Sequence, residues 1–137
     1  MTNKEIGRIG LSMAINYFTL KGYTISLPLN DTQWYDDMVV EKNGIFQTIQ
    51  CKATMTEDDT ISIKSCGGTK GRVYDTILNH SGLDYLFCVN KDLNMWLIPV
   101  SAIKEARITK TFQLRTVLAP SGRPKLDTTI YRVQISD

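Results

Sequence analysis

The chain has 137 residues, which is the length of one domain, and its 42% hydrophobic and 22% charged residues are typical of a globular protein. Sixteen basic and 14 acidic residues leave a net charge of +2, so charge alone supports a nucleic-acid partner only weakly. No run approaches the roughly 18 apolar residues of a membrane helix, and the first residues lack the apolar core of a signal peptide. We therefore expect a single domain over residues 1–137 in the cytoplasm.

The cysteine pattern agrees with that location. Cys51, Cys66 and Cys88 are an odd number, lie far apart in the sequence and form no CxxC pair. Reduced thiols in a cytosol are the simplest interpretation. A single histidine excludes the usual clustered Cys/His zinc sites.

The first predicted element is a helix over residues 3–21, because apolar residues recur there at spacings of three and four. Gly22 follows as a C-terminal cap residue. Gly7 and Gly10 lie inside this helix, where each costs roughly 1 kcal/mol relative to alanine. Close approach of the backbone to a neighbour or to a ligand would explain them, and so would tight packing. A strand is expected next, over residues 23–27.

A hairpin is the strongest local signal in the chain. Apolar runs at 38–40 and 45–49 flank Asn43-Gly44, a dipeptide favoured in type I′ turns because both central residues adopt positive φ. With a two-residue loop, Lys42 faces Ile45.

The same register brings three polar residues together. Counting back from the turn, Asp37 faces Gln50, and Lys52 shares that face because side chains alternate with a period of two. An acid, an amide and an ammonium would then lie within roughly 5–8 Å, as in a functional site. The alternative is a cross-strand salt bridge between Asp37 and Lys52, worth about 1 kcal/mol or less.

The second half of the chain is expected to add further strands and two short helices. In order we predict a strand at 60–64, a glycine-rich loop at 66–71, a helix at 72–79, apolar strands at 85–89 and 95–99, a helix at 102–106, and a C-terminal hairpin of 112–118 with 128–135 around a basic turn at 120–125.

The polar hairpin resembles the core motif of the PD-(D/E)XK nucleases. In that family an acid begins one strand, and the next strand carries an acid, any residue and a lysine. Asp37, Gln50 and Lys52 match this motif with the spacing D-x(12)-[EQ]-x-K. One branch, which includes small phage and bacterial endonucleases and a cyanobacterial-type intron homing endonuclease, has similar residues elsewhere. The matching positions are 4–10, 22–23, Pro28, 35–36 and Pro99.

The resemblance implies an α/β fold with a restriction-endonuclease-like core. Its sheet would be mixed and mostly antiparallel, with four to five strands flanked by helices and a C-terminal β-hairpin. The resemblance also implies a catalytic Mg²⁺ bound by the Asp37 carboxylate, the Gln50 amide oxygen and the Cys51 backbone carbonyl. Lys52 would orient the attacking water or stabilise negative charge in the transition state.

Two positions depart from the family pattern. Gln50 replaces the usual glutamate and removes one negative charge. Leu11 stands where members of the family usually have a glutamate on the first helix. Position 11 is therefore degenerate with respect to the family's metal site. Glu5 does not replace that residue, because it lies about 120° away around the helix. Asp37 is then the only carboxylate at a matching metal position.

These features together predict a metal-dependent, site-specific endonuclease of double-stranded DNA, most similar to homing endonucleases. Cutting two strands requires two active sites, so we expect a homodimer or homotetramer. Candidate phosphate contacts are the basic residues of the glycine-rich loop and of the C-terminal turn, namely Lys70, Arg72, Arg123 and Lys125.

Two alternatives remain open. A structure-selective nuclease of the Holliday-junction type would share the core motif. A DNA-binding module with a degenerate nuclease site would explain Leu11 and Gln50.

Overall fold

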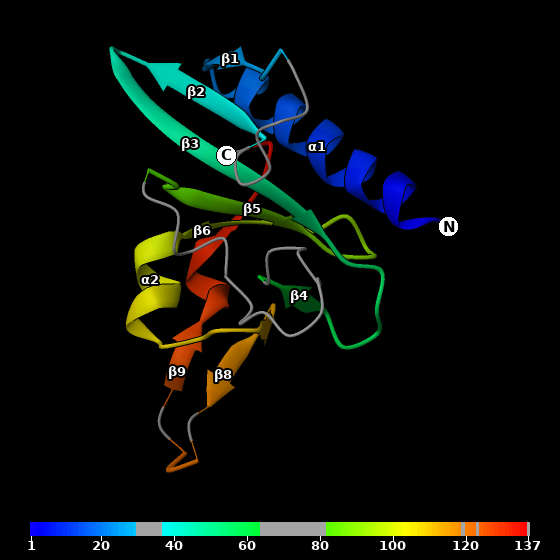
Figure 1. Cartoon of the computed structure of the whole chain (residues 1–137), viewed down its shortest axis with the longest axis vertical. Helices are drawn as coiled ribbons and strands as arrows, with labels where there is room; N and C mark the ends of the chain where they lie inside the picture. The colour runs from blue at the N-terminus through cyan, green and yellow to red at the C-terminus, as the bar shows by residue number, and fades with distance from the viewer. Residues whose placement is uncertain (30–36, 64–81, 119, 123, 137) are drawn as a thin grey trace, which may run out of the picture.

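The computed structural model describes residues 1–29, 37–63, 82–118, 120–122 and 124–136 (Figure 1). Its helices and strands are α1 (Asn3–Leu20), β1 (Thr24–Ser26), β2 (Met38–Lys42), β3 (Ile45–Ala53), β4 (Thr60–Ser62), β5 (Tyr85–Val89), β6 (Met95–Pro99), α2 (Val100–Glu105), β7 (Thr111–Gln113), β8 (Thr116–Leu118), β9 (Pro124–Asp127), the 3₁₀ helix η2 (Thr128–Tyr131) and β10 (Arg132–Val133). The predicted helix at 72–79 and loop at 66–71 lie outside the described residues.

The central sheet is mixed and mostly antiparallel, as predicted. Within the described ranges it has six strands in the order β1-β2-β3-β5-β6-β10. Only β3 and β5 pair in parallel, and the other neighbours in this sheet are antiparallel. The sheet exceeds the expected four to five strands because the two-residue β10 joins β6 at one edge. Two further strand pairs, β4 with β7 and β8 with β9, lie outside it.

Helix α1 packs along one face of this sheet, next to β3 (Figure 1). Thr2 caps its start, since the Thr2 hydroxyl oxygen accepts a hydrogen bond from the Glu5 N–H at 3.2 Å. The chain leaves the helix through Gly22 at φ +86°. Phe18 is buried against Phe87 of β5, with ring centroids 5.9 Å apart. No helix among the described residues has the length and apolar character of a membrane span.

The two faces of the sheet bury separate cores. Phe87 and Val89 belong to the cluster under α1, whereas Leu86 and Cys88 belong to the cluster that contains residues of α2, β4 and β7. This division follows from the alternation of side chains along β5. Residues of β3 that pair with Leu86 and Cys88 therefore face away from α1.

The C-terminal hairpin differs from the prediction. Strand β8 pairs with β9, whereas Thr128–Tyr131, expected to begin a strand, forms η2. Thr128 is fully buried and donates its hydroxyl to the Arg115 carbonyl at 3.1 Å, and the Asp127 carboxylate accepts from the Thr129 N–H at 3.0 Å. Such side-chain to backbone hydrogen bonds compete with strand pairing. Strand β7, expected as part of this hairpin, pairs with β4 instead.

Candidate active site

The β2–β3 hairpin has the predicted turn and register. Asn43 and Gly44 have φ values of +53° and +79°, as a type I′ turn requires. Cross-strand partners run from Lys42 with Ile45 to Met38 with Ile49. The local turn chemistry thus sets which residues of β3 lie beside the start of β2.

Asp37 lies at that start, immediately before β2. Its N–H donates to the Ile49 carbonyl at 2.8 Å, and one oxygen of its carboxylate accepts from the Cys51 N–H at 2.7 Å. Ile49 and Cys51 flank Gln50 on β3. The carboxylate therefore occupies the position of a backbone acceptor just before the start of β2. It is held beside Gln50, which is close to the predicted pairing.

Gln50 carries an unusual buried polar group. The residue is 8% exposed, and none of the described groups donates a hydrogen bond to its amide oxygen. An unsatisfied buried acceptor costs about 1–3 kcal/mol. Gln50 pairs with Leu86 in the register, so it lies on the sheet face away from α1. A buried oxygen that accepts no hydrogen bond can bind a cation or a ligand that donates a hydrogen bond.

Cys51 contributes backbone atoms to the same place. In an extended strand the N–H and C=O of one residue point to the same side, so the Cys51 carbonyl points to the side on which Asp37 contacts its N–H. The Cys51 thiol packs against the cluster under α1. Burial raises the pKa of this thiol well above 9.0, and the negative charge of Asp37 adds to the shift. Cys51 is a neutral core thiol and not a nucleophile, as the sequence indicated.

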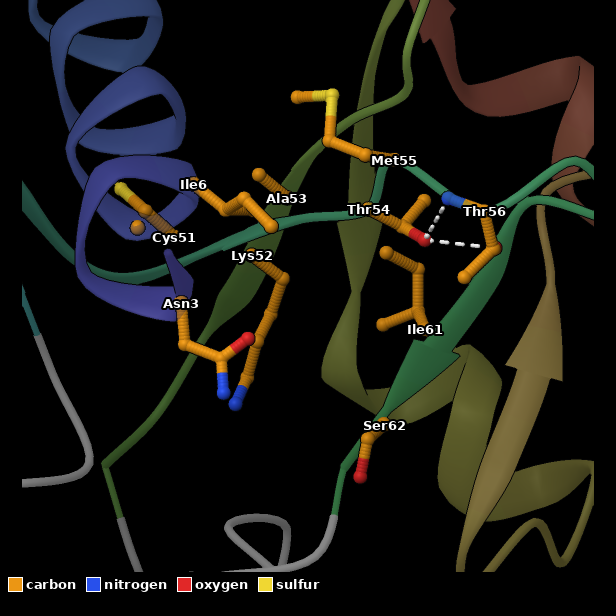
Figure 2. Close-up of a pocket in the computed structure, with 11 residues that line it drawn as sticks. Asn3, Ile6, Cys51, Lys52, Ala53, Thr54, Met55, Thr56, Ile61 and Ser62 are labelled. Carbon is orange, nitrogen blue, oxygen red and sulfur yellow. Dashed lines mark hydrogen bonds between the residues drawn. The ribbon is translucent and has the colours of Figure 1, made fainter. Parts of the chain in front are cut away.

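Lys52 is half-buried and lines a pocket of about 410 Å³ together with Asn3 (Figure 2). Helix α1 approaches the backbone here, because a Cβ on Gly10 would lie 3.3 Å from the Ala53 Cβ and 3.5 Å from the Lys52 carbonyl carbon. Close packing explains Gly10. Gly7 also lines the pocket, but outside its own stretch of helix no atom of the described residues lies within 4 Å of its Cβ position.

The remaining predicted residues divide into three kinds. Leu11 is half-buried and packs against the cluster under α1, so position 11 has a packing role. Lys125 is exposed on β9. Lys70, Arg72 and Arg123 lie outside the described residues.

The oxygen ligands beside the start of β2 fit a hard divalent cation. They are a carboxylate, an amide oxygen and a backbone carbonyl, and Mg²⁺ binds few protein oxygens because it keeps several waters. The described part of the chain contains no cluster of three His, Cys, Asp or Glu residues placed to hold a metal. Any site here therefore depends on the unpartnered Gln50 oxygen beside Asp37.

The pocket beside Lys52 was not predicted from the sequence. Asn3 and Ile6 reach it from α1, and Ile61 and Ser62 reach it from β4. The position of β4 depends on its pairing with β7, some fifty residues later in the chain. The one available signal was Gly7, a helical glycine without an evident packing reason.

Because the Cys88 thiol is buried, the stability of the domain is expected to fall at alkaline pH. Burial raises the pKa of this thiol from 9.0 to about 12, against a smaller lowering by Lys52. The unfolded chain ionises first, so the free energy of unfolding is unaffected by this thiol below pH 9.0 and falls as the pH rises towards about 12. The expected slope reaches about 1.4 kcal/mol per pH unit.

Urea unfolding from about pH 8 to 11 measures this slope. A Cys88→Ala variant is expected to be less stable throughout, because a cavity replaces the thiol, yet less sensitive to pH. Parallel curves for the two proteins would contradict the assignment.

An α/β domain that places an acid, an amide and a lysine on two adjacent strands has the architecture of a restriction-endonuclease-like nuclease. The sequence matches the family described as PD-(D/E)XK endonuclease over residues 1–134, so the chain belongs to that family. Among solved structures, it is similar to a bacterial homing endonuclease, I-Ssp6803I, with a TM-score of 0.74 over 96% of this chain and 89% of that chain. Their identity is 16%, so this likeness concerns the fold. A search of curated proteins finds no match.

Proposed function

We propose that the chain is a site-specific endonuclease that hydrolyses phosphodiesters of double-stranded DNA with Mg²⁺. The observation that carries this proposal is the buried, unpartnered amide oxygen of Gln50 beside the carboxylate of Asp37. Family membership supports DNA as the substrate and hydrolysis as the reaction. The likeness of the fold to a homing endonuclease supports the site-specific form.

Each residue of the hairpin site has a separate role in this proposal. Asp37, Gln50 and the Cys51 carbonyl hold the metal ion, which when bound polarises the phosphate and lowers the pKa of a water. Lys52 orients the attacking water and offers positive charge to the phosphate oxygens as negative charge grows there. The hydrogen bond from the Cys51 N–H fixes the Asp37 carboxylate before the metal arrives.

The proposed assembly is a homodimer or homotetramer, because breaking both strands requires two copies of the site. Lys125 on β9 is an exposed candidate phosphate contact, and we propose Lys70, Arg72 and Arg123 with it on the basis of sequence. The thiols of Cys51 and Cys88 are free, which fits a reducing cytoplasm.

A second candidate is a DNA-binding module whose nuclease site has degenerated. The packing of Leu11 against the core favours it, since the helix then supplies no carboxylate at that position. Such a module would bind DNA with no Mg²⁺-dependent cleavage.

The choice of substrate is tested by offering the protein two DNAs in Mg²⁺. One is a randomised linear duplex library, and the other is a four-way junction with arms of unrelated sequence. Cuts in the library at one long recognition sequence, with the junction left intact, are expected. Cutting of the junction at its branch point regardless of sequence would replace the proposal with a structure-selective nuclease.

A Gln50→Glu variant is expected to bind Mg²⁺ roughly tenfold more tightly, because it adds a second carboxylate beside Asp37. Without metal, the same change places two like charges together and lowers stability. The melting temperature without Mg²⁺ measures the loss of stability, and its rise on adding Mg²⁺ measures the tighter binding. Gln47→Glu is the matched control, since Gln47 lies on the same strand but pairs with Val40. An equal response of the two variants would exclude Gln50 as a metal ligand.

A further inference from the structure

The pocket beside Lys52 lies between the start of α1, the end of β3 and strand β4 (Figure 2). Its volume is about 410 Å³. Lys52 and Asn3 bring an ammonium and an amide, and Figure 2 shows the two side chains pointing in the same direction. Half-buried Ile6 brings aliphatic surface. The pocket thus joins a cationic, hydrogen-bonding part to an apolar part.

The chemistry of the lining selects a class of ligand. None of the described lining residues is a carboxylate, and Lys52 is the charged one among them, so the pocket favours an anion. None of these lining residues is aromatic either, whereas nucleobases are usually held by stacking on aromatic rings. A phosphate attached to an aliphatic sugar matches the lining better than a base does.

Gly7 supplies an independent indication that something enters this space. It lies inside α1, where glycine is unfavourable, and its backbone is not in the left-handed region. Gly10 on the same helix is explained by contacts with Ala53 and Lys52, but a Cβ on Gly7 would meet no atom of the other described residues within 4 Å, apart from its own stretch of helix. Packing among the described residues therefore does not require a glycine at position 7. An added methyl group would stand in the open pocket.

We propose that this pocket holds the sugar–phosphate backbone of the cut strand, next to the phosphodiester that is hydrolysed. The proposal rests on the proposed function and adds Asn3 and Gly7 as substrate-binding residues. The Asn3 amide and the Lys52 ammonium contact phosphate oxygens, and the deoxyribose packs on Ile6. Gly7 lets the sugar approach the helix backbone closely.

The test uses deoxythymidine 3′,5′-bisphosphate, a small probe with one sugar between two phosphates. Gly7→Ala is expected to raise the melting temperature of the free protein by about 3 °C, because alanine favours the helix. The same change is expected to weaken binding of the probe about tenfold in titration calorimetry, because the methyl group fills part of the pocket. Stability and binding would then change in opposite directions.

Two further variants separate the pocket from general effects on the helix. Ser12→Ala is an exposed change in the same helix and is expected to raise the melting temperature slightly and leave binding of the probe unchanged. Asn3→Asp keeps the size of the side chain and suits the first turn of a helix, but its charge is expected to weaken binding of the probe at least as strongly as Gly7→Ala.

Equal affinity of the wild type and Gly7→Ala for the probe, or no binding of the probe by the wild type, would overturn the inference. Cleavage of duplex DNA by the wild type is measured separately. Cleavage that is the same in both proteins would reject the pocket and leave the endonuclease standing. Probe binding that follows the expected order, in a protein that cuts no DNA, would reject the endonuclease and keep the pocket as a site for the DNA backbone.

Discussion

A Lys52→Met variant is expected to cleave DNA at least about a hundredfold more slowly than the wild type, because one positioned proton-transfer or charge-stabilising group typically contributes that much. Methionine keeps most of the aliphatic length of lysine, so the half-buried stem retains its packing. Binding of duplex DNA is expected to weaken only modestly, since many phosphate contacts share it. Single-turnover cleavage in Mg²⁺, with binding measured by anisotropy in Ca²⁺, separates the two effects.

Lys42→Met is the control for this variant, because Lys42 belongs to the same hairpin. Its ammonium donates to the Lys21 carbonyl at 2.8 Å and lies 5.2 Å from the Tyr23 ring centroid. Loss of these contacts is expected to lower stability and leave the cleavage rate unchanged. A Lys52→Met protein that cuts at the wild-type rate would mean that the catalytic lysine lies elsewhere.

An Asp37→Asn variant is expected to lose cleavage by about a hundredfold or more and to lose its stabilisation by Mg²⁺. The amide oxygen of asparagine can still accept from the Cys51 N–H, so the hairpin is expected to fold. The loss would then come from the missing charge, because Asp37 is the carboxylate among the proposed ligands. The melting temperature with and without Mg²⁺, together with the cleavage rate, measures it.

Asp84→Asn provides the matched control. The Asp84 carboxylate accepts from the Thr48 N–H at 2.9 Å, a contact with β3 of the same kind as that of Asp37 with Cys51. This variant is expected to keep both cleavage and the response to Mg²⁺. Similar losses of cleavage and of stabilisation by Mg²⁺ in the two variants would show that both carboxylates stabilise β3 and that Asp37 does not bind the metal.

Turn chemistry and apolar patterning made several elements predictable from the sequence. Asn43-Gly44 specifies a turn whose two residues both need positive φ, and this turn sets the register of β2 on β3. The bounds of β5 and β6 were predicted correctly, because a strand that is buried on both faces forms a continuous apolar segment in the sequence. The proximity of Asp37 to Gln50 followed from the same local register.

Features that depend on distant contacts could not be predicted in this way. The parallel pairing of β3 with β5 joins segments separated by more than thirty residues, and no local signal specifies it. The sequence around Thr128 is typical of a strand, but Thr128 is the first residue of a 3₁₀ helix, and its buried hydroxyl donates to the Arg115 carbonyl. Within the site, the alternation of side chains did not reveal that Asp37 leaves the ladder and binds the Cys51 N–H.

The most direct test of the central claim is strand scission of the duplex library by the wild-type protein in Mg²⁺, with EDTA as the control. We expect double-strand breaks at a defined sequence that disappear when the metal is chelated. Tight binding of DNA without any scission in Mg²⁺ would contradict the account. In that case Leu11 and Gln50 would mark a nuclease fold that has become a DNA-binding module.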